Sequence, residues 1–167
     1  DFNSYLARHR QSRGDYAGAI GPMSKLAAKY PNNITYQGEL AQNYFQTKQY
    51  DKALEHFMEA QRLSEEAGPH SDDDGKPLPQ PDYNTMIGLT YFRMGDMANA
   101  ETYLEKGLKR DRLDKLANLT MGELEFRRKD FRKAMNYFKV VASEPGYKEA
   151  VKDFYEQIEK ELFAGVD

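Results

Sequence analysis

Large and small apolar residues return at a fixed interval along this 167-residue chain. Leu6-Ala7 and Leu40-Ala41 lie 34 residues apart, and Ile87-Gly88 and Met121-Gly122 repeat that interval. A large residue, an alanine and a second large residue then follow each pair at constant spacing: Tyr16, Ala19 and Met23; Tyr50, Ala53 and Phe57; Met97, Ala100 and Leu104; Phe131, Ala134 and Phe138. A period of roughly 20 to 50 residues is typical of a solenoid. The pattern therefore predicts four copies of one structural unit.

Each copy is predicted to be two antiparallel helices joined by a tight turn, because apolar residues recur at three- and four-residue spacing. The turns are expected at Arg13-Gly14-Asp15, Lys48-Gln49, Met94-Gly95-Asp96 and Lys129-Asp130. Glycine in a turn supplies the left-handed residue that ends the first helix, and aspartate accepts N–H groups at the start of the second. We therefore expect an all-α superhelix of four helix-turn-helix repeats.

The chain is predicted to form one domain over residues 1–167, in which the repeats span 1–33, 34–67, 81–114 and 115–148. The insertion 68–80 contains several prolines and Asp72-Asp73-Asp74, and it lacks the ligand spacing of a calcium loop. We expect it to be a solvated loop, disordered or stiffened by proline. Residues 149–163 predict a capping helix. Its apolar face would carry Val151, Phe154, Ile158 and Leu162.

These recurring positions make the chain resemble the tetratricopeptide repeat family, whose motif is W-x2-L-G-x2-Y, A-x3-F-x2-A and then P. The second repeat matches the motif at Leu40, Ala41, Tyr44, Ala53, Phe57 and Ala60. The chain departs from it at the tryptophan position throughout, and at Arg10 and Glu125, where an aromatic residue is usual. The resemblance implies a superhelix that binds proteins.

Composition and motifs argue against several other functions. With 24 basic and 27 acidic residues, the chain lacks the basic excess of a nucleic-acid binder. The absence of cysteine excludes disulfides and cysteine-based zinc sites. The three histidines have no catalytic partner at a recognisable spacing, and the glycines of 14–21 lack the Lys-Ser/Thr of a phosphate loop. We therefore expect no catalytic residues, no metal and no cofactor, and no enzyme activity.

No apolar run is long enough for a membrane helix, so no direct membrane insertion is expected. A cytoplasmic location is favoured, and a periplasmic one would follow if a signal had been removed. The first residue is not Met, and the repeat frame begins one residue before Asp1. These two observations predict that residues upstream of Asp1 have been removed. The basic cluster Arg127-Arg128-Lys129 is interpreted as a solvated helix end, with an anion or nucleic-acid site as the alternative.

The resemblance implies that the first helices of successive repeats line a concave surface. The residues at the corresponding binding positions are Arg8, Gln42, Phe45, Gln46, Leu89, Phe92, Arg93, Glu123, Phe126 and Arg127. The phenylalanines would supply apolar contacts, the arginines charge and the glutamines hydrogen bonds to a peptide with some acidic character. Alternatively, the phenylalanines pack against neighbouring helices. The positions that grip chaperone tails hold Ser4, Arg8, Glu39, Asp82 and Met86 instead of the required residues, so such a clamp is not expected.

The leading hypothesis is a non-catalytic adaptor that binds a peptide or protein segment in its concave groove. One alternative is a self-assembling scaffold, whose partner is the protein itself, that organises an organelle surface or envelope complex, as magnetosome-associated scaffolds do. The other is the recruiting domain of a larger, truncated protein.

Overall fold

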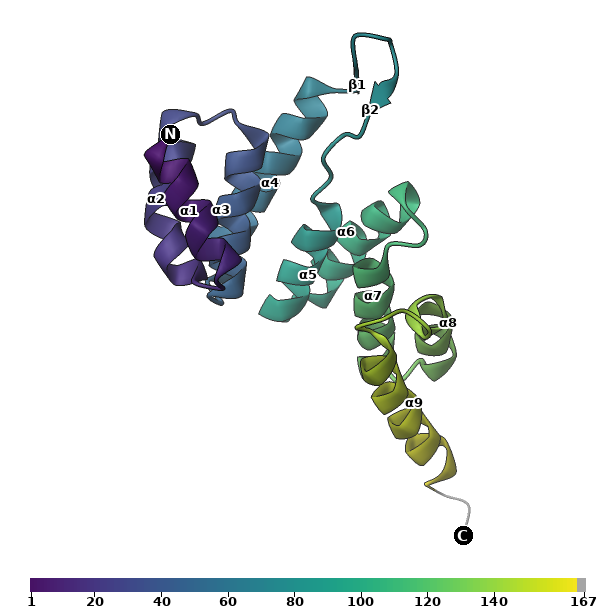
Figure 1. The fold of residues 1–167 in the computed structure, drawn as a ribbon. Coiled ribbons are helices and arrows are strands. Elements are labelled where there is room, and N and C mark those ends of the chain that lie inside the picture. Colours follow the sequence, from purple (N-terminus) through teal and green to yellow (C-terminus); the bar gives the residue numbers. More distant parts are fainter. Residues whose placement is uncertain (165–167) are drawn as a thin grey trace.

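The computed structural model describes residues 1–164, and these form nine helices and one small hairpin (Figure 1). The helices are α1 (Phe2–Ser12), α2 (Tyr16–Lys29), α3 (Ile34–Gln46), α4 (Tyr50–Ala67), α5 (Asn84–Met94), α6 (Met97–Arg110), α7 (Lys115–Arg127), α8 (Phe131–Val141) and α9 (Lys148–Phe163). Helices α1 to α8 form four helix-turn-helix pairs, and each pair packs on the next. The expectation of an all-α superhelix of four repeats and a C-terminal helix is confirmed.

The core lies between the two helices of each pair and continues across the junctions between pairs. Alanines at the closest approaches, such as Ala7, Ala41 and Ala134, have no exposed surface. Large side chains such as Phe57 and Phe138 fill the space that the small residues leave. The alternation of small and large residues in the sequence is therefore what brings the helix backbones together.

The four turns within the repeats share one backbone conformation. Gly14 and Gly95 have φ angles of 77° and 85°, and Lys48 and Lys129 take the same left-handed conformation with φ angles of 61° and 62°. The sequence predicted the positions of the turns, and it predicted the conformation where glycine is present. The two lysines show that the fold imposes the left-handed residue even where the side chain disfavours it.

The insertion between α4 and α5 forms a short hairpin, which the sequence did not predict. Strands β1 (His70–Ser71) and β2 (Pro77–Leu78) pair antiparallel, and the Asp72 carboxylate accepts hydrogen bonds from the N–H groups of Asp74 and Lys76 in the turn. The hairpin projects away from the helices (Figure 1). The expected loop, disordered or stiffened by proline, is therefore an exposed strand pair, in which the Asp72 carboxylate closes the turn.

The base of the hairpin is fixed to the neighbouring helices by hydrogen bonds. The Gln80 side chain donates to the Ser64 carbonyl at 2.7 Å, and the Ser64 hydroxyl donates to the Pro81 carbonyl. The Arg110 guanidinium donates to the Gln80 carbonyl from α6. The Gln61 side chain accepts from the Tyr83 N–H at 2.7 Å. These bonds place the start of α5 against α4 despite the inserted residues.

Helix α9 covers the last repeat through its apolar face. Val151 and Ile158 are buried, and the Phe154 ring lies 4.7 Å from Phe138 and 5.2 Å from Phe126, centroid to centroid. Leu162 was expected on this face, but it is 58% exposed because the contact ends one turn earlier. None of the helices in residues 1–164 combines the length and the apolar character needed to cross a membrane.

Candidate functional site

The candidate site is the surface formed by the first helices of the four repeats, here called the inner face. Its ten predicted residues lie on α1, α3, α5 and α7: Arg8, Gln42, Phe45, Gln46, Leu89, Phe92, Arg93, Glu123, Phe126 and Arg127. Exposure divides them into three groups. Arg8, Gln46, Arg93 and Arg127 are exposed; Gln42, Phe45, Glu123 and Phe126 are half-buried; Leu89 and Phe92 are buried. The polar members are therefore the ones most available to a ligand.

At the N-terminal end of the inner face, polar side chains link α1 to α3. Arg8 forms an exposed ion pair with Glu39 at 3.4 Å, and the Gln11 side chain donates to the Asn43 Oδ1 atom at 2.9 Å. Beside them, α1 and its N-cap border a shallow hollow of about 500 Å³. It is lined by Asp1, Ser4, Tyr5, Arg8, His9 and Ser12. This end of the face is thus open, polar and able to accept or donate hydrogen bonds.

Two polar groups at this junction could not be recognised as a pair from the sequence. Glu39 and Asn43 are one turn apart on α3, and Asn43 is fully buried. Within residues 1–164, the Glu39 Oε2 and Asn43 Nδ2 atoms make no hydrogen bond. A buried polar atom without a partner costs about 1–3 kcal/mol. The contact of Gln11 with Asn43 joins two polar residues of different repeats, so only the register of the superhelix could have revealed it.

In the middle of the inner face, Phe45 and Phe92 are less exposed than expected for side chains that contact a ligand. Phe45 is half-buried, and its ring packs edge-on against Tyr50 with 5.5 Å between centroids. Phe92 is 2% exposed. The Arg127 guanidinium of the next repeat lies 4.4 Å from its ring centroid, a cation–π arrangement. Phe92 thus forms the floor of the inner face, and Leu89, which is 6% exposed, does the same.

At the C-terminal end, the inner face is partly covered by α9. Phe126 packs against Phe131 and Phe154, with centroid distances of 5.7 and 5.2 Å. Arg127 pairs with Glu123 at 3.1 Å and remains half-exposed. The alternative that the phenylalanines pack against neighbours therefore applies to Phe45 and Phe126, which are half-buried, and most fully to Phe92. Arg93, which is exposed on α5, forms no ion pair within residues 1–164.

The other candidate groups do not assemble into a site of their own. Of the basic cluster, Arg127 pairs with Glu123, and Arg128 bridges Glu101 and Glu125. The hydrogen bonds to Glu101 raise the pKa of Arg128 and lower that of Glu101. His56 packs on Tyr44 within the helix pair, away from the inner face residues. In the described part of the chain, His, Asp and Glu side chains do not gather in a group that could hold a metal ion.

Comparison with known sequences identifies two of the repeats. A sequence model of the tetratricopeptide repeat matches residues 34–66 and 81–112, which are the segments containing α3–α4 and α5–α6. No curated protein matches the chain.

Solved structures resemble the whole superhelix at low sequence identity. A chain of the APC/C hetero-tetramer Cut9-Hcn1 is 15% identical, with a TM-score of 0.70 over 92% of this chain. This protein spans only 27% of that chain's length. The MamA protein is 15% identical, with a TM-score of 0.67, and the match covers 99% of this chain and 94% of MamA. PilF from Pseudomonas aeruginosa is 19% identical, with a TM-score of 0.66, and the match covers 98% of this chain and 76% of PilF. At these identities, the likeness concerns the fold.

Proposed function

Because the chain is a tetratricopeptide-repeat protein, we propose that it is a non-catalytic scaffold that binds a peptide or protein segment along the inner face. The observation that carries this proposal is the contrast between exposed polar residues and a buried apolar floor. Arg8, Gln46, Arg93 and Arg127 are exposed, whereas Leu89 and Phe92 are buried. The Arg127 guanidinium lies over the Phe92 ring. Such a surface offers charge and hydrogen bonds without requiring the protein to unpack.

The charge of the exposed residues favours a segment with acidic side chains. Arg8 and Arg127 already pair with Glu39 and Glu123, but both arginines keep about half of their side-chain surface exposed. Arginine can form two parallel hydrogen bonds with one carboxylate, so an acidic ligand could share or replace these pairs. The first contact would fall on Arg93, which belongs to no ion pair within residues 1–164.

Helix α3 supplies the second part of the recognition. The Gln46 side chain is exposed and that of Gln42 is half-buried, so both amides can exchange hydrogen bonds with a ligand. An extended segment offers N–H and carbonyl groups along its backbone. We therefore place the backbone of the bound segment at Gln42 and Gln46, with acidic side chains toward Arg8 and Arg93.

A peptide-display selection tests this proposal. A random 12-residue library is selected against the wild-type protein, and enriched peptides are measured against Arg93→Glu and Gln46→Ala. We expect acidic sequences whose affinity falls at least tenfold with Arg93→Glu, and less with Gln46→Ala. Lys25→Glu, a charge reversal on the exposed side of α2, is the matched control and should leave affinity unchanged. Enriched peptides that bind Arg93→Glu as well as the wild type, or no enrichment at all, would overturn the proposal.

A further inference from the structure

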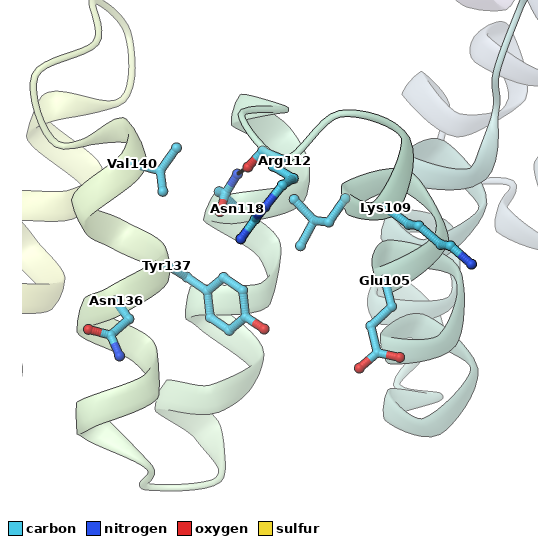
Figure 2. A pocket seen from close by; sticks show the side chains of 8 residues that line it. Glu105, Lys109, Arg112, Asn118, Asn136, Tyr137 and Val140 are labelled. Carbon is cyan, nitrogen blue, oxygen red and sulfur yellow. Dashed lines mark hydrogen bonds between the residues drawn. The ribbon is translucent and has the colours of Figure 1, made fainter.

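A cleft of about 570 Å³ lies between α6 and α8, on the second helices of the last two repeats and therefore outside the inner face. Its lining residues are Glu105, Leu108, Lys109, Arg112, Asn118, Asn136, Tyr137 and Val140. Figure 2 shows α6 and α8 as the two walls, with Arg112 and the Tyr137 ring reaching into the space between them. Nothing in the proposed peptide binding uses this surface.

The charges along one wall of the cleft follow a simple order. From the middle of α6 to the turn after it, the lining residues run from acidic Glu105 through apolar Leu108 to basic Lys109 and Arg112. Glu105, Lys109 and Arg112 are exposed, and none of them forms an ion pair in the described part of the chain. At a rise of about 1.5 Å per residue, Glu105 and Arg112 are on the order of 10 Å apart.

The order of charges along α6 is complementary to the same order in the opposite direction, because an acidic end then meets a basic end. We propose that the cleft is an interface between two copies of this chain, in which the two α6 helices lie antiparallel across a two-fold axis next to Leu108. Glu105 of each copy then faces Arg112 of the other, because the midpoint between these two positions falls between Leu108 and Lys109. A two-fold interface uses the same patch on both subunits, so both ion pairs form at once.

The apolar residues of the cleft suit the centre of such an interface. Leu108, Tyr137 and Val140 are half-buried in the single chain, so they offer apolar surface that a second copy would cover. Apolar and aromatic side chains at the centre with charged groups around them are typical of protein interfaces. A second copy in the reversed direction places an opposite charge at both Glu105 and Arg112. The second copy is therefore the occupant that the charges favour.

Sedimentation velocity across a concentration series tests the inference through two charge reversals. The wild type is expected to dimerise, and less so at high salt, because exposed ion pairs are screened. Glu105→Arg and Arg112→Glu each place two like-charged pairs in the interface, and each should raise the dimer dissociation constant at least tenfold. An equimolar mixture of the two variants should dimerise again, because every arginine at these two positions then faces a glutamate of the other copy. Lys25→Glu is the control and should behave as the wild type.

Circular dichroism of each variant shows whether loss of the dimer reflects unfolding, and the mixture provides a second check, since unfolded chains would not restore it. A wild type that stays monomeric at every concentration would overturn the inference. So would single variants that dimerise like the wild type, or a mixture that remains monomeric. The peptide-display experiment is independent of these outcomes, because its variants leave α6 unchanged.

Discussion

The Arg10 guanidinium donates a 2.5 Å hydrogen bond to the Gly18 carbonyl, a group that helix α2 cannot satisfy itself. In a regular helix the Gly18 carbonyl would accept from the N–H of residue 22, but that residue is Pro22, which has none. Pro22 is buried inside α2. The donor therefore comes from α1: Arg10 supplies the hydrogen bond that Pro22 cannot make.

This relationship predicts that the two residues are coupled in stability. Arg10→Met should lower the free energy of unfolding by about 1–3 kcal/mol, because it leaves the Gly18 carbonyl without its donor. In a Pro22→Ala background the N–H of residue 22 is restored, and the same substitution should cost less. A double-mutant cycle by urea denaturation measures the difference. Arg13→Met, at an exposed position after α1, is the control, and equal costs of Arg10→Met in both backgrounds would contradict the coupling.

The departures of this chain from the repeat motif can be explained only with the structure. Arg10 and Glu125 replace the usual aromatic residue in the first and fourth repeats. Arg10 serves the Gly18 carbonyl, and Glu125, which is 4% exposed, pairs with Arg128. The roles of the periodic residues could be predicted from the sequence because every repeat packs them in the same way. The roles of Arg10 and Glu125 could not be predicted, because each depends on a partner that the other repeats lack.

The left-handed lysines predict an easy gain in stability. Lys48 and Lys129 have positive φ angles, which are unfavourable for residues with a Cβ. Replacing each lysine by glycine should raise the free energy of unfolding by about 0.5–1 kcal/mol. Gly95→Ala, at the equivalent turn of the third repeat, should lower it by a similar amount or more. Thermal and chemical denaturation of the three variants measure this, and a loss of stability in Lys129→Gly would refute the explanation.

Two helical glycines predict unequal effects of the same substitution. A Cβ on Gly122 would lie 2.4 Å from the Phe138 ring, which has no exposed surface, so Gly122→Ala should destabilise the fold by about 1–3 kcal/mol. A Cβ on Gly21 in α2 meets nothing within 4 Å apart from its chain neighbours. The next residue is Pro22, whose ring opposes a Cβ on the preceding helical residue and so offsets the gain of about 0.5–1 kcal/mol in helix propensity. Gly21→Ala should therefore change the free energy of unfolding much less than Gly122→Ala. Urea titrations of both variants test the pair, and equal losses of stability would refute the packing argument.

His56 gives the fold a dependence on pH. Its Nδ1 lies 2.8 Å from the Gln37 Oε1 atom, and its ring stacks on Tyr44. The Gln37 Nε2 atom donates to the Pro31 carbonyl, which turns the Oε1 atom toward the histidine. His56 Nδ1 is therefore the donor. Burial lowers the pKa of His56 below its ordinary value of 6.5, and the carboxylates of Glu55 and Glu59 oppose this only in part.

The sign of the effect follows from the lowered pKa. The unfolded chain takes up a proton on His56 near pH 6.5, whereas the folded chain resists it until a lower pH. The stability contributed by the neutral ring is complete above pH 6.5 and is lost as the pH falls below it. Unfolding free energies measured at several pH values between about 7.5 and 5 should decrease for the wild type. The unfolding free energy of His56→Gln should decrease less over the same pH range. Equal decreases in the wild type and His56→Gln would show that other groups cause the change.

The inner face shows where prediction from the sequence ends. The resemblance located the ten residues on the first helices, since their register follows from the repeat itself. It could not tell that Phe92 would be covered, because Arg127 reaches it from the following repeat. It also gave no sign of the unused Asn43 donor, which results from how α1 and α3 meet. The positions of side chains along a repeat are local, but their exposure depends on the neighbouring repeat.

The hairpin between α4 and α5 leaves and rejoins the body of the protein at one junction, where Ser64, Gln80 and Arg110 bind its base. The stacking of the second repeat on the third is thus maintained by side chains and not by the length of the connecting chain. The length of the tip, residues 72–75, therefore does not determine the distance between α4 and α5. The tip of the hairpin is therefore a suitable insertion site, where a label, a tether or a whole additional domain could be added without changing the pitch of the superhelix.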